Sequence, residues 1–364
     1  MKVLRILTRA NLGGPARQLA ALAPAFERLG VEETIAVGQV DAAETELALP
    51  SEAHVVEIKD LVRGVAPLRD RRARRALSRL IDELQPDVLH SHTAKAGLLA
   101  VRLGRSRGIP VVHSYHGHVL RDYFRPALAR GLVHIERRLA RARTALTCVS
   151  ASCGRELEEL SVLRPGSWTL VEPAVRPQEL PGRSLLRAEL GVDPAARAVA
   201  WCGRFEAVKD PLLFVQVARE LTRHGVLVHA FGSGRLLEAS RALAERIEAR
   251  IVWHGPDADF PRRVAAFDAV LSTSLREGYP VAAIEALLAA VPVIAPRVPG
   301  FVDLAANALD DGVHLEPREA AALATAVLAA RPPSSATCQS LRALHDPGRI
   351  AALYAEIYAR VVAT

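Results

Sequence analysis

The stretch Ser272–Gly300, STSLREGYPVAAIEALLAAVPVIAPRVPG, decides the fold that this sequence predicts. It begins where the apolar run Ala269–Leu271 ends, passes through a polar turn, and continues into a helix whose first turn suits Pro280. A buried strand followed directly by a helix is the building unit of a parallel sheet covered by helices. Glu277 and Glu285 stand on either side of the helix start, so both can face the carboxyl end of the strand, where open α/β sheets bind ligands.

The residues around this helix start indicate a ligand that carries both phosphate and hydroxyl groups. The backbone N–H groups near Gly278, Tyr279 and Val281 can bind an anion, helped by the helix dipole. A carboxylate beside a phosphate would repel it, so Glu277 and Glu285 are better suited to accepting hydrogen bonds from hydroxyls. A sugar nucleotide provides both kinds of group.

Strands and helices alternate along most of the chain, in two successive series. The first series starts with a buried strand at Val3–Leu7, and the second starts with another at Val199–Cys202. This alternation predicts the α/β class, with doubly wound parallel sheets that carry helices on both faces. Between the series, Glu172–Arg183 is rich in proline and has little periodicity, which is typical of a linker. A chain of 364 residues is long enough for two domains, which we place at 1–172 and 184–345, with a linker at 173–183.

Composition and charge narrow the classes of partner and compartment. A formal net charge of +7 permits anionic partners: nucleotide sugars, phospholipid surfaces or nucleic acid. Because the sequence shows no recognition helix, aromatic stacking platform or basic tail, we expect no nucleic-acid partner. The four cysteines form no Cys-x-x-Cys pair, which is typical of reduced thiols in a cytoplasm. The start of the chain lacks the apolar core of a signal peptide, and no apolar run is long enough to cross a bilayer. We therefore expect a cytoplasmic protein that can also lie on the inner face of the cell membrane.

Two further stretches carry residue types suited to binding an anion. Gly13-Gly14 follow the first predicted strand, where paired glycines let a ligand approach backbone N–H groups; taken alone, the pair is also typical of a plain tight turn. Arg204 and Lys209 follow the first strand of the second series. Two solvated cations are the plain alternative, but a cation near a helix N-terminus opposes the dipole, which favours a functional role.

The motif Glu277-Gly-Tyr-Pro280 followed by Glu285 resembles the Glu–seven residues–Glu motif of retaining nucleotide-sugar glycosyltransferases, specifically glycosyltransferase family 4. The resemblance extends over nearly the whole chain through Leu12-Gly13-Gly14, Tyr115-His116-Gly117, Gly203-Arg204-Phe205 with Lys209, and Pro299-Gly300. It implies the GT-B fold, in which two Rossmann-like domains face a central cleft. It also implies that the closing helix, residues 346–364, packs back on the first domain.

The resemblance assigns a role to each matched residue. It implies that His116 meets the transferred sugar, that Arg204 and Lys209 bind the donor diphosphate, and that Glu277 binds sugar hydroxyls. The other donor-binding residues that it implies are Gly13, Gly14, Gly203, Gly232, Gly234, His254, Gly278, Tyr279, Pro280, Val281 and Glu285. On the acceptor side we place Asn11, Arg17, His92 and His118.

Two clusters raise the question of a metal ion. Alternation along a strand puts His90 and His92 on one face, a spacing that metal ligands use. Asp257-Ala-Asp259 matches the Asp-x-Asp that binds manganese in the other major glycosyltransferase fold. However, no carboxylate or cysteine accompanies the histidines at a fixed spacing, and a helix cap explains Asp259. We therefore favour a site that needs neither a metal nor another cofactor.

The resemblance implies a retaining transfer of a hexose or N-acetylhexosamine from a UDP-sugar to a hydroxyl acceptor. The acceptor can be a bacterial cell-envelope glycan, a lipid-linked sugar or a natural product. An enzyme similar to UDP-N-acetylglucosamine 2-epimerase, which shares the two-domain fold, is one alternative. A non-catalytic basic protein that binds a membrane surface is the other.

The helix expected at Phe124–Arg141 bears on a membrane role. Its apolar stripe favours core packing, while its basic face could dock on anionic lipid. The stripe consists of Phe124, Leu128, Leu132, Ile135 and Leu139, and the basic face of Arg130, Arg137 and Arg141.

The sequence departs from the family pattern at two places. Ala289-Ala290 precede a strand where a glycine is common, and Glu172-Pro-Ala replaces Asn-Gly-Val at the linker. The family pattern therefore gives no firm expectation for the structure at the end of the central helix and at the start of the linker.

Overall fold

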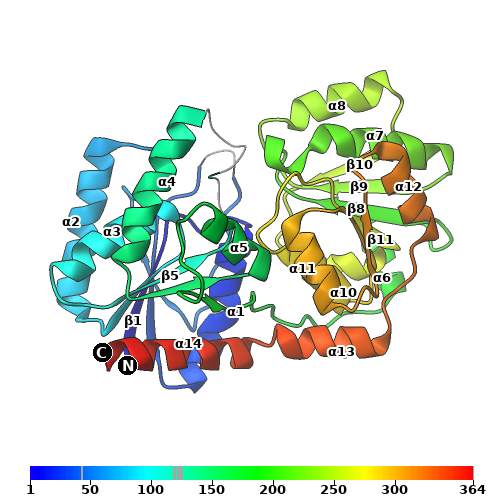
Figure 1. Cartoon of the computed structure of the whole chain (residues 1–364). Coiled ribbons are helices and arrows are strands. Elements are labelled where there is room, and N and C mark those ends of the chain that lie inside the picture. Colours follow the sequence, from blue (N-terminus) through cyan, green and yellow to red (C-terminus); the bar gives the residue numbers. More distant parts are fainter. Residues whose placement is uncertain (42–43, 118–119, 121–125, 364) are drawn as a thin grey trace. The chain divides into compact units, whose positions relative to one another are not determined.

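The computed structural model describes residues 1–41, 44–117, 120 and 126–363, with the backbone alone for 126–128. The chain forms two compact units (Figure 1). The first unit comprises Met1–Val175 together with His345–Thr364, and the second comprises Arg176–Leu344. Both contain a parallel sheet with helices on its two faces, so the predicted fold class is confirmed.

A parallel sheet of seven described strands forms the centre of the first unit, in the order β3-β2-β1-β4-β5-β6-β7. Arg5 of β1 lies opposite Ile35 of β2 on one side and His90 of β4 on the other. The order reverses between β1 and β4, which is the topological switch point of a doubly wound sheet. The strands are β1 (Lys2–Leu7), β2 (Glu32–Val37), β3 (His54–Glu57), β4 (Val88–Ser91), β5 (Val111–Tyr115), β6 (Ala145–Cys148) and β7 (Thr169–Leu170).

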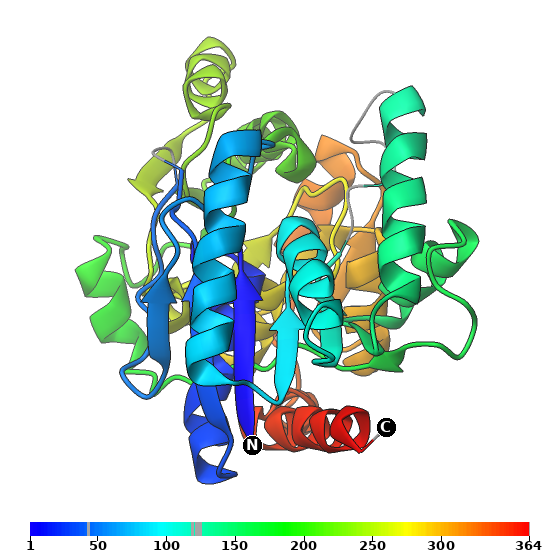
Figure 2. The ribbon, with the colours of Figure 1, turned by 90° about the vertical axis from the view of Figure 1, so that its left-hand side faces the viewer.

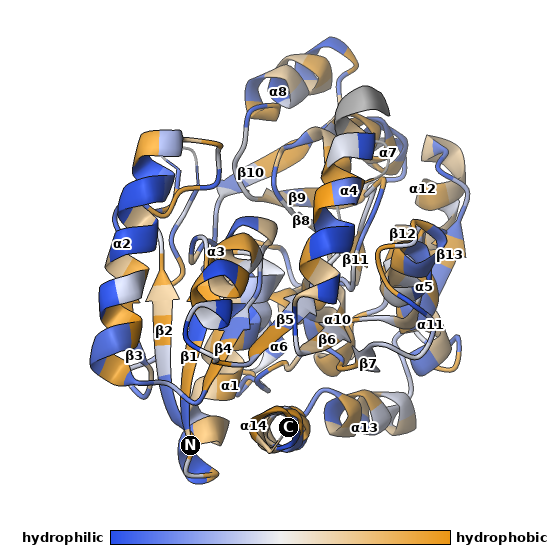
Figure 3. Ribbon diagram, turned by 60° about the vertical axis from the view of Figure 1, so that its left-hand side comes forward, coloured by the Kyte–Doolittle hydropathy of each residue, from blue (hydrophilic) through white to orange (hydrophobic). Residues whose placement is uncertain are grey.

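Helices cover both faces of this sheet because successive strand residues point to opposite sides. Val3 lies in one core cluster with Phe26 of α1 and Tyr354 of α14. The next residue, Leu4, lies in a second cluster with Leu77 of α2. Figure 2 shows α2, α3 and α4 side by side, and Figure 3 shows broad hydrophilic bands on α2 and α4 over mainly hydrophobic strands. The helices are α1 (Gly14–Arg28), α2 (Pro67–Leu84), α3 (Ala94–Arg105), α4 (Pro126–Arg141), α5 (Ala151–Glu159) and α14 (Pro347–Val362).

The second unit repeats the architecture with a sheet of six described strands, in the order β10-β9-β8-β11-β12-β13. Its described pairs are parallel, and the order reverses between β8 and β11. On one face, Phe214 of α7 and Leu323 of α12 complete a core with Trp201 of β8. On the other face, α10 packs on β12 and against α13.

The strands of the second unit are β8 (Ala198–Cys202), β9 (Leu227–Phe231), β10 (Ile251–Gly255), β11 (Ala269–Leu271), β12 (Val293–Pro296) and β13 (Val313–Glu316). Its helices are α6 (Arg183–Glu189), α7 (Pro211–Arg223), α8 (Leu237–Arg246), α9 (Phe260–Arg263), α10 (Val281–Leu288), α11 (Pro299–Asn307), α12 (Ala320–Ala329) and α13 (Ser335–Leu344). Two short 3-10 helices complete it, η1 (Ala207–Lys209) and η2 (Val264–Ala266).

The chain passes between the units twice, and the two passages are hydrogen-bonded to each other. The N–H of Val175 donates to the carbonyl oxygen of His345 at 3.0 Å, and Nδ1 of His345 lies 2.8 Å from the carbonyl oxygen of Pro173. Glu172, which departs from the family pattern, is buried and lies 3.7 Å from Arg349 of α14. The helix α14 itself packs on α1 within the first unit. The substituted linker start is thus fixed by a charge on the closing helix.

The helix predicted at Phe124–Arg141 is α4, but Phe124 and the side chain of Leu128 lie outside what the structure describes. Leu132 and Leu139 pack in core clusters, as the apolar stripe predicts. Ile135 instead is 48% exposed.

The predicted basic face of α4 is only partly open to solvent. Arg130 and Arg141 are exposed, whereas Arg137 donates from Nη2 to the carbonyl oxygen of Leu160 at 2.7 Å. In the part of the chain that is described, no helix is both long and apolar enough to cross a membrane.

Candidate functional site

The residues predicted for the site gather at the carboxyl edges of the two sheets. In the second unit, the loops that follow β8 and β11 meet at the switch point and carry Arg204, Lys209 and Glu277. In the first unit, the loops that follow β1 and β4 carry Gly13 and His92. Ligands of open α/β sheets bind at this edge, so each unit presents one candidate binding edge.

Lys209 and Glu277 form an ion pair across the switch point of the second unit. Lys209 ends η1, and its Nζ contacts Oε1 of Glu277, which follows β11. The hydroxyl of Ser274 donates to the same carboxylate oxygen at 2.6 Å. The side chains of Lys209 and Glu277 are 24% and 13% exposed, so solvent reaches both. The family resemblance assigns them to different parts of a ligand, so binding of that ligand would exchange this ion pair for two new contacts.

Thr273 holds together the two loops that carry this pair. Its fully buried Oγ1 accepts a hydrogen bond from Nε1 of Trp201 at 3.1 Å and donates to the carbonyl oxygen of Lys209 at 2.8 Å. The N–H of Leu275 donates to the carbonyl oxygen of Val208 at 2.8 Å. The position of the Lys209 backbone is therefore fixed from β11. The sequence analysis missed Thr273, for which the available signal was a hydroxyl residue close behind the apolar run of β11.

Three of the predicted donor-binding glycines bring two backbone loops into contact. A Cβ on Gly232, at φ +138°, would lie 1.9 Å from the carbonyl oxygen of Gly203. A Cβ on Gly234, at φ +148°, would lie 2.6 Å from the carbonyl oxygen of Phe205. Glycine is required at both positions because of the positive φ and the close approach. Their observed role is to pack the loop after β9 against the loop that carries Arg204.

The guanidinium of Arg204 makes no hydrogen bond or ion pair with the residues that the structure describes. Its neighbour Glu206 is held instead by Arg235, with Nη2 2.9 Å from Oε2. That hydrogen bond, and to a smaller extent the charge of Arg204, lowers the pKa of Glu206. Arg204 is half-buried at the carboxyl end of β8. A guanidinium in this position is suited to a phosphate or another oxyanion.

The helix α10 begins at Val281, and Pro280 is its N-cap, one position before the first turn in which the sequence analysis placed it. No side chain caps this helix, which leaves its first backbone N–H groups suited to an anion. Glu285 lies in the second turn and is 8% exposed. The hydroxyl of Tyr279 accepts a hydrogen bond from Nδ2 of Asn307 at 2.7 Å, which anchors the turn before α10 to α11.

Gly300 lets α11 approach the turn that carries the carboxylate. A Cβ at Gly300 would lie 2.8 Å from the carbonyl oxygen of Glu277 and 2.9 Å from that of Gly278. The match of Pro299-Gly300 to the family pattern thus has a packing reason at the site.

His254, predicted to contact the nucleotide, has its ring packed inward. The ring stacks on Phe231 with centroids 4.4 Å apart, and Nε2 lies 2.8 Å from Nδ1 of His229. Burial lowers the pKa of both histidines, that of His229 to about 4. Protein groups therefore hold this ring, which leaves the backbone of His254 for the nucleotide contact that the resemblance implies.

The Asp-x-Asp segment is explained by local contacts. Oδ1 of Asp257 accepts the N–H of Asp259 at 2.8 Å, and Oδ2 lies 2.8 Å from Arg263. Asp259 is the N-cap of α9 but makes no side-chain cap bond, so the capping role predicted for it is wrong in detail and the turn is held by Asp257. Among the described residues, no group of three or more His, Cys, Asp or Glu is placed to hold a metal ion.

In the first unit, the glycine loop after β1 forms the start of α1. Gly13 is the N-cap of this helix, and a Cβ there would lie 2.9 Å from Oδ1 of Asn11. Nδ2 of Asn11 donates to Glu44 at 3.0 Å, and Glu44 also pairs with Nε of Arg9 at 2.5 Å. Arg17, one turn into α1, is half-buried. The amide of Asn11, predicted to meet an acceptor, therefore braces the loop in this structure.

The structure brings His92 and His116 together. Nδ1 of His92 lies 3.0 Å from Nε2 of His116, and Nε of Arg5 lies 3.1 Å from Nε2 of His92. His116 is half-buried, and burial followed by the charge of Arg5 lowers its pKa to about 3. His92 is 2% exposed and both its ring nitrogens have partners, so it supports His116. The sequence analysis had predicted a different role, in which His92 meets the acceptor. His118, the other predicted acceptor histidine, lies outside the described residues.

Behind this pair lies a polar network that extends to the closing helix. The rings of His90 and His92 have centroids 4.1 Å apart, which confirms that they share a face. The nitrogens of His90 lie 2.6 Å from the hydroxyl of Tyr358 and 2.8 Å from that of Ser114. The hydroxyl of Tyr354 lies 3.0 Å from Oγ of Ser114. The two tyrosines, which the sequence analysis did not single out, thus complete the hydrogen bonds of a buried histidine.

Two family models match the chain, one over most of each unit. The model described as Glycosyltransferase Family 4 matches residues 12–179, and that described as Glycosyl transferases group 1 matches residues 196–330. Together they include every site residue predicted above except Asn11. The chain belongs to the glycosyltransferases of the family 4 and group 1 type. The motif resemblance is thereby confirmed, and the protein is a glycosyltransferase with the GT-B fold.

Curated relatives of this glycosyltransferase have moderate sequence identity. The UDP-Gal:alpha-D-GlcNAc-diphosphoundecaprenol alpha-1,3-galactosyltransferase of Escherichia coli is 25% identical over 270 residues, which cover 70% of this chain and 68% of the relative. The D-inositol 3-phosphate glycosyltransferase of Kineococcus radiotolerans is 29% identical, covering 62% of this chain and 57% of the relative. The matches thus span between about half and two thirds of the relatives' length.

Solved structures resemble the glycosyltransferase over its full length. Sucrose-phosphate synthase from Thermosynechococcus elongatus has a TM-score of 0.84 at 17% identity, covering 100% of this chain and 99% of that one. The Anabaena protein HepE in complex with UDP and glucose has a TM-score of 0.81 at 18% identity, covering 99% of this chain and 100% of that one. At these identities the likeness establishes the fold.

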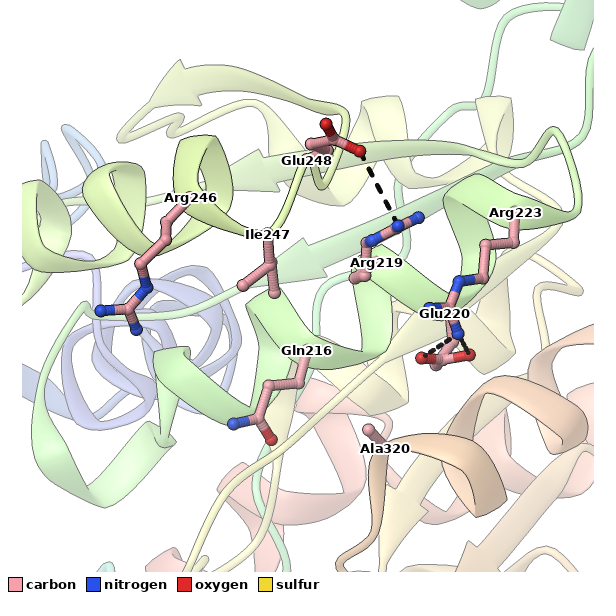
Figure 4. Close-up of a pocket in the computed structure, with 8 residues that line it drawn as sticks. All are labelled: Gln216, Arg219, Glu220, Arg223, Arg246, Ile247, Glu248 and Ala320. Atoms are coloured by element: carbon pink, nitrogen blue, oxygen red, sulfur yellow. Dashed lines mark hydrogen bonds and ion pairs between the residues drawn. The ribbon is translucent and has the colours of Figure 1, made fainter.

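An open cavity of about 530 Å³ in the second unit lies apart from the glycosyltransferase motifs (Figure 4). Its lining comes from α7, the end of α8 and the start of α12, and includes no predicted site residue. Its arginines are partly neutralised, because Arg219 lies 3.8 Å from Glu248 and Arg223 lies 2.8 Å from Glu220. The cavity therefore adds nothing to the candidate site.

Proposed function

We propose that the protein transfers a hexose or N-acetylhexosamine from a UDP-sugar to a hydroxyl acceptor, with retention of the anomeric configuration. The observation that carries this proposal is the placement of Arg204, Lys209 and Glu277 on the two loops that meet at the switch point of the second sheet. Two cations there suit a diphosphate, and a carboxylate suits sugar hydroxyls. UDP as the nucleotide is supported by the UDP bound in the Anabaena structure and by the UDP-Gal in the name of the Escherichia coli relative.

In the proposed reaction, Lys209 leaves Glu277 for the donor diphosphate, and Glu277 accepts hydrogen bonds from the sugar. The bond between the anomeric carbon and the diphosphate oxygen breaks while a bond to the acceptor oxygen forms on the same face. The acceptor hydroxyl gives its proton to an oxygen of the leaving diphosphate, whose negative charge Arg204 and Lys209 stabilise. The step requires no protein nucleophile and no metal, and His116 contacts the transferred sugar.

The acceptor is proposed to carry a phosphate, as a lipid-linked sugar does. The name of the Escherichia coli relative gives a diphosphoundecaprenol acceptor, and that of the Kineococcus relative gives inositol 3-phosphate. A net charge of +7 favours such anionic partners.

A lipid-linked acceptor would bring the protein to a membrane surface, and we propose α4 as a contact. Arg130, Arg138 and Arg141 are exposed on this helix together with Ile135. Basic residues beside an exposed apolar side chain suit the surface of an anionic bilayer. Sedimentation with phosphatidylglycerol vesicles should capture the protein at low salt and release it at high salt, and failure to bind at low salt would exclude the contact.

The proposed reaction is tested with purified protein and UDP-glucose, UDP-galactose or UDP-N-acetylglucosamine, each with lipid-linked and soluble acceptors, with and without EDTA. We expect an α-linked product from the α-linked donor, formed equally well in EDTA. A β-linked product would exclude retention, and loss of activity in EDTA would contradict metal independence. Conversion of UDP-N-acetylglucosamine without any acceptor would support the epimerase alternative instead.

A further inference from the structure

A line of hydrogen-bonded side chains crosses four neighbouring strands of the first unit and ends at their carboxyl edge. Glu33 lies on β2, Arg5 on β1, and His92 and His116 directly follow β4 and β5. Nη1 of Arg5 lies 2.7 Å from Oε1 of Glu33, and both side chains are almost fully buried. The line then continues from Nε of Arg5 through the ring of His92 to Nε2 of His116.

The direction of each hydrogen bond follows from the chemistry of the groups. A guanidinium has only donors, so Nε2 of His92 must accept from Nε of Arg5. A neutral imidazole has one donor and one acceptor, so His92 carries its proton on Nδ1 and donates it to Nε2 of His116. His116 then accepts at Nε2 and carries its own proton on Nδ1.

Both imidazoles are held neutral by their surroundings. A proton added to His92 would lie beside the buried charge of Arg5, and burial together with that charge lowers its pKa well below the usual value. Burial acts to lower the pKa of Arg5, but the charge of Glu33, together with smaller contributions from Tyr358 and Tyr354, raises it overall, so Arg5 stays charged. The ring of His92 is also packed against that of His90, which the hydroxyls of Tyr358 and Ser114 fix in place.

We propose that Glu33, Arg5 and His92 are positioning residues that lock His116 as the neutral tautomer with its proton on Nδ1. This inference rests on the proposed function, in which His116 contacts the transferred sugar. The locked tautomer offers that sugar a hydrogen-bond donor and no acceptor. The sugar atom that it meets must therefore be an oxygen with a lone pair to offer, such as that of a hydroxyl.

The tautomers can be measured directly by long-range ¹H–¹⁵N correlation of the histidine rings in protein labelled with ¹⁵N-histidine, near pH 7. The signals of His92 and His116 are assigned from the variants H92Q and H116Q. We expect both rings to be protonated at Nδ1 and unprotonated at Nε2. A proton on Nε2 of either ring, or a doubly protonated ring, would overturn the proposal.

Two substitutions of His92 separate positioning from packing. Gln keeps an acceptor for Arg5 and a donor for His116, whereas Leu keeps neither. In H92L we expect His116 to populate both tautomers, and kcat/KM with UDP-glucose, or with UDP-galactose where glucose is not transferred, to fall by about 10²-fold, the order expected when a contacting group loses its orientation. In H92Q the Nδ1–H tautomer and most of the activity should return. Should H92L not fold, the spectra of the unsubstituted protein and of H92Q still decide.

Activity and tautomer in H92L test different contacts of His116. If H92L has wild-type activity but a changed His116 tautomer, His92 does position His116, but His116 does not contact the sugar. If folded H92L leaves the His116 tautomer unchanged, His92 does not position His116, whatever the activity of the variant.

Discussion

The carboxyl edges of the two sheets are built in different ways, although the sheets share their topology. In the first unit, buried side chains from several strands and from α14, among them the Arg5–Glu33 ion pair, support one half-buried ring, that of His116. In the second unit, closely packed glycine loops and Thr273 hold charged side chains that solvent can reach. The first edge thus fixes the orientation of one ring, whereas the second presents charged side chains that solvent can reach. Damage to the first should affect stability and pH dependence, whereas damage to the second should affect mainly the reaction.

Acid should destabilise the first unit more than the second, where burial lowers the pKa of two described histidines, His229 and His254. Burial lowers the pKa of His90, His92 and His113 well below the usual value, and that of His116 to about 3. Because the unfolded chain binds their protons below about pH 6.5, stability is complete above that value and is lost as pH falls toward 3. Within this window, each such histidine lowers the free energy of unfolding by about 1.4 kcal/mol for every pH unit of acidification.

Hydrogen exchange between pH 7 and pH 4.5 tests this difference. The amides of β4 and β5 should lose protection at a higher pH than those of β8 and β11. Equal loss of protection in both units would contradict the contrast between the two edges.

Removing a charge from the second edge should abolish transfer without unfolding the protein. Arg204→Ala deletes a cation proposed to stabilise the leaving diphosphate, and we expect kcat to fall by about 10²–10³-fold, or about 3–4 kcal/mol. The melting temperature should not change, since the guanidinium makes no ion pair with any described residue. Arg235→Ala is the matched control, because this exposed arginine pairs with Glu206 and has no part in the proposed reaction. Normal turnover by Arg204→Ala would remove the diphosphate role.

The close approach of α11 to the carboxylate turn predicts a smaller effect that combines activity and stability. A Cβ in Gly300→Ala must displace the carbonyl groups of Glu277 and Gly278, at a cost of about 1–3 kcal/mol in the free energy of unfolding. The shifted Glu277 should also lower kcat/KM. Gly182→Ala is the control, since a Cβ there meets nothing within 4 Å. If the two variants behave alike in thermal unfolding and in turnover, the packing argument is wrong.

The smallest effect concerns the position where the family pattern has a glycine. Ala290 follows α10 in the left-handed region at φ +57°, which costs a residue with a Cβ about 1–2 kcal/mol. Ala290→Gly removes that strain but makes the unfolded chain more flexible, so we expect a net gain of about 0.5–1 kcal/mol. Denaturant unfolding measures it, and a destabilised variant would show that the strain estimate is wrong.

Sequence reasoning succeeded where the signal was local. The alternation of strands and helices predicted the fold class because each strand and each helix has its own hydrophobic pattern. The motif from Glu277 to Glu285 predicted the family because it lies within one strand–helix unit. It gave no element at α13, because Ser335–Leu344 follows a proline-rich stretch and has a mixed polar pattern. It also could not foresee the pairing of Lys209 with Glu277, which are far apart in the chain.

The network below His116 was beyond sequence reasoning for a related reason. The histidines at two strand ends were noticed, but the partners that determine their roles lie on other elements. Arg5 is a charged residue within the strand predicted at Val3–Leu7, and the structure shows it to be a fully buried group in the sheet. A buried charge of this kind follows from tertiary contacts alone, since its partner Glu33 is on the adjacent strand.

The place of α14 in the first unit has a consequence for how the protein is made. Tyr354 and Tyr358 complete the surroundings of His90 and Ser114, yet the ribosome adds them only after all of Arg176–Leu344. At about 5–20 residues per second, the earlier half waits roughly ten to thirty seconds for its covering helix. During this interval the apolar side of Phe26 and its neighbours has no cover from Tyr354, so the unfinished chain exposes a surface of the kind that promotes aggregation.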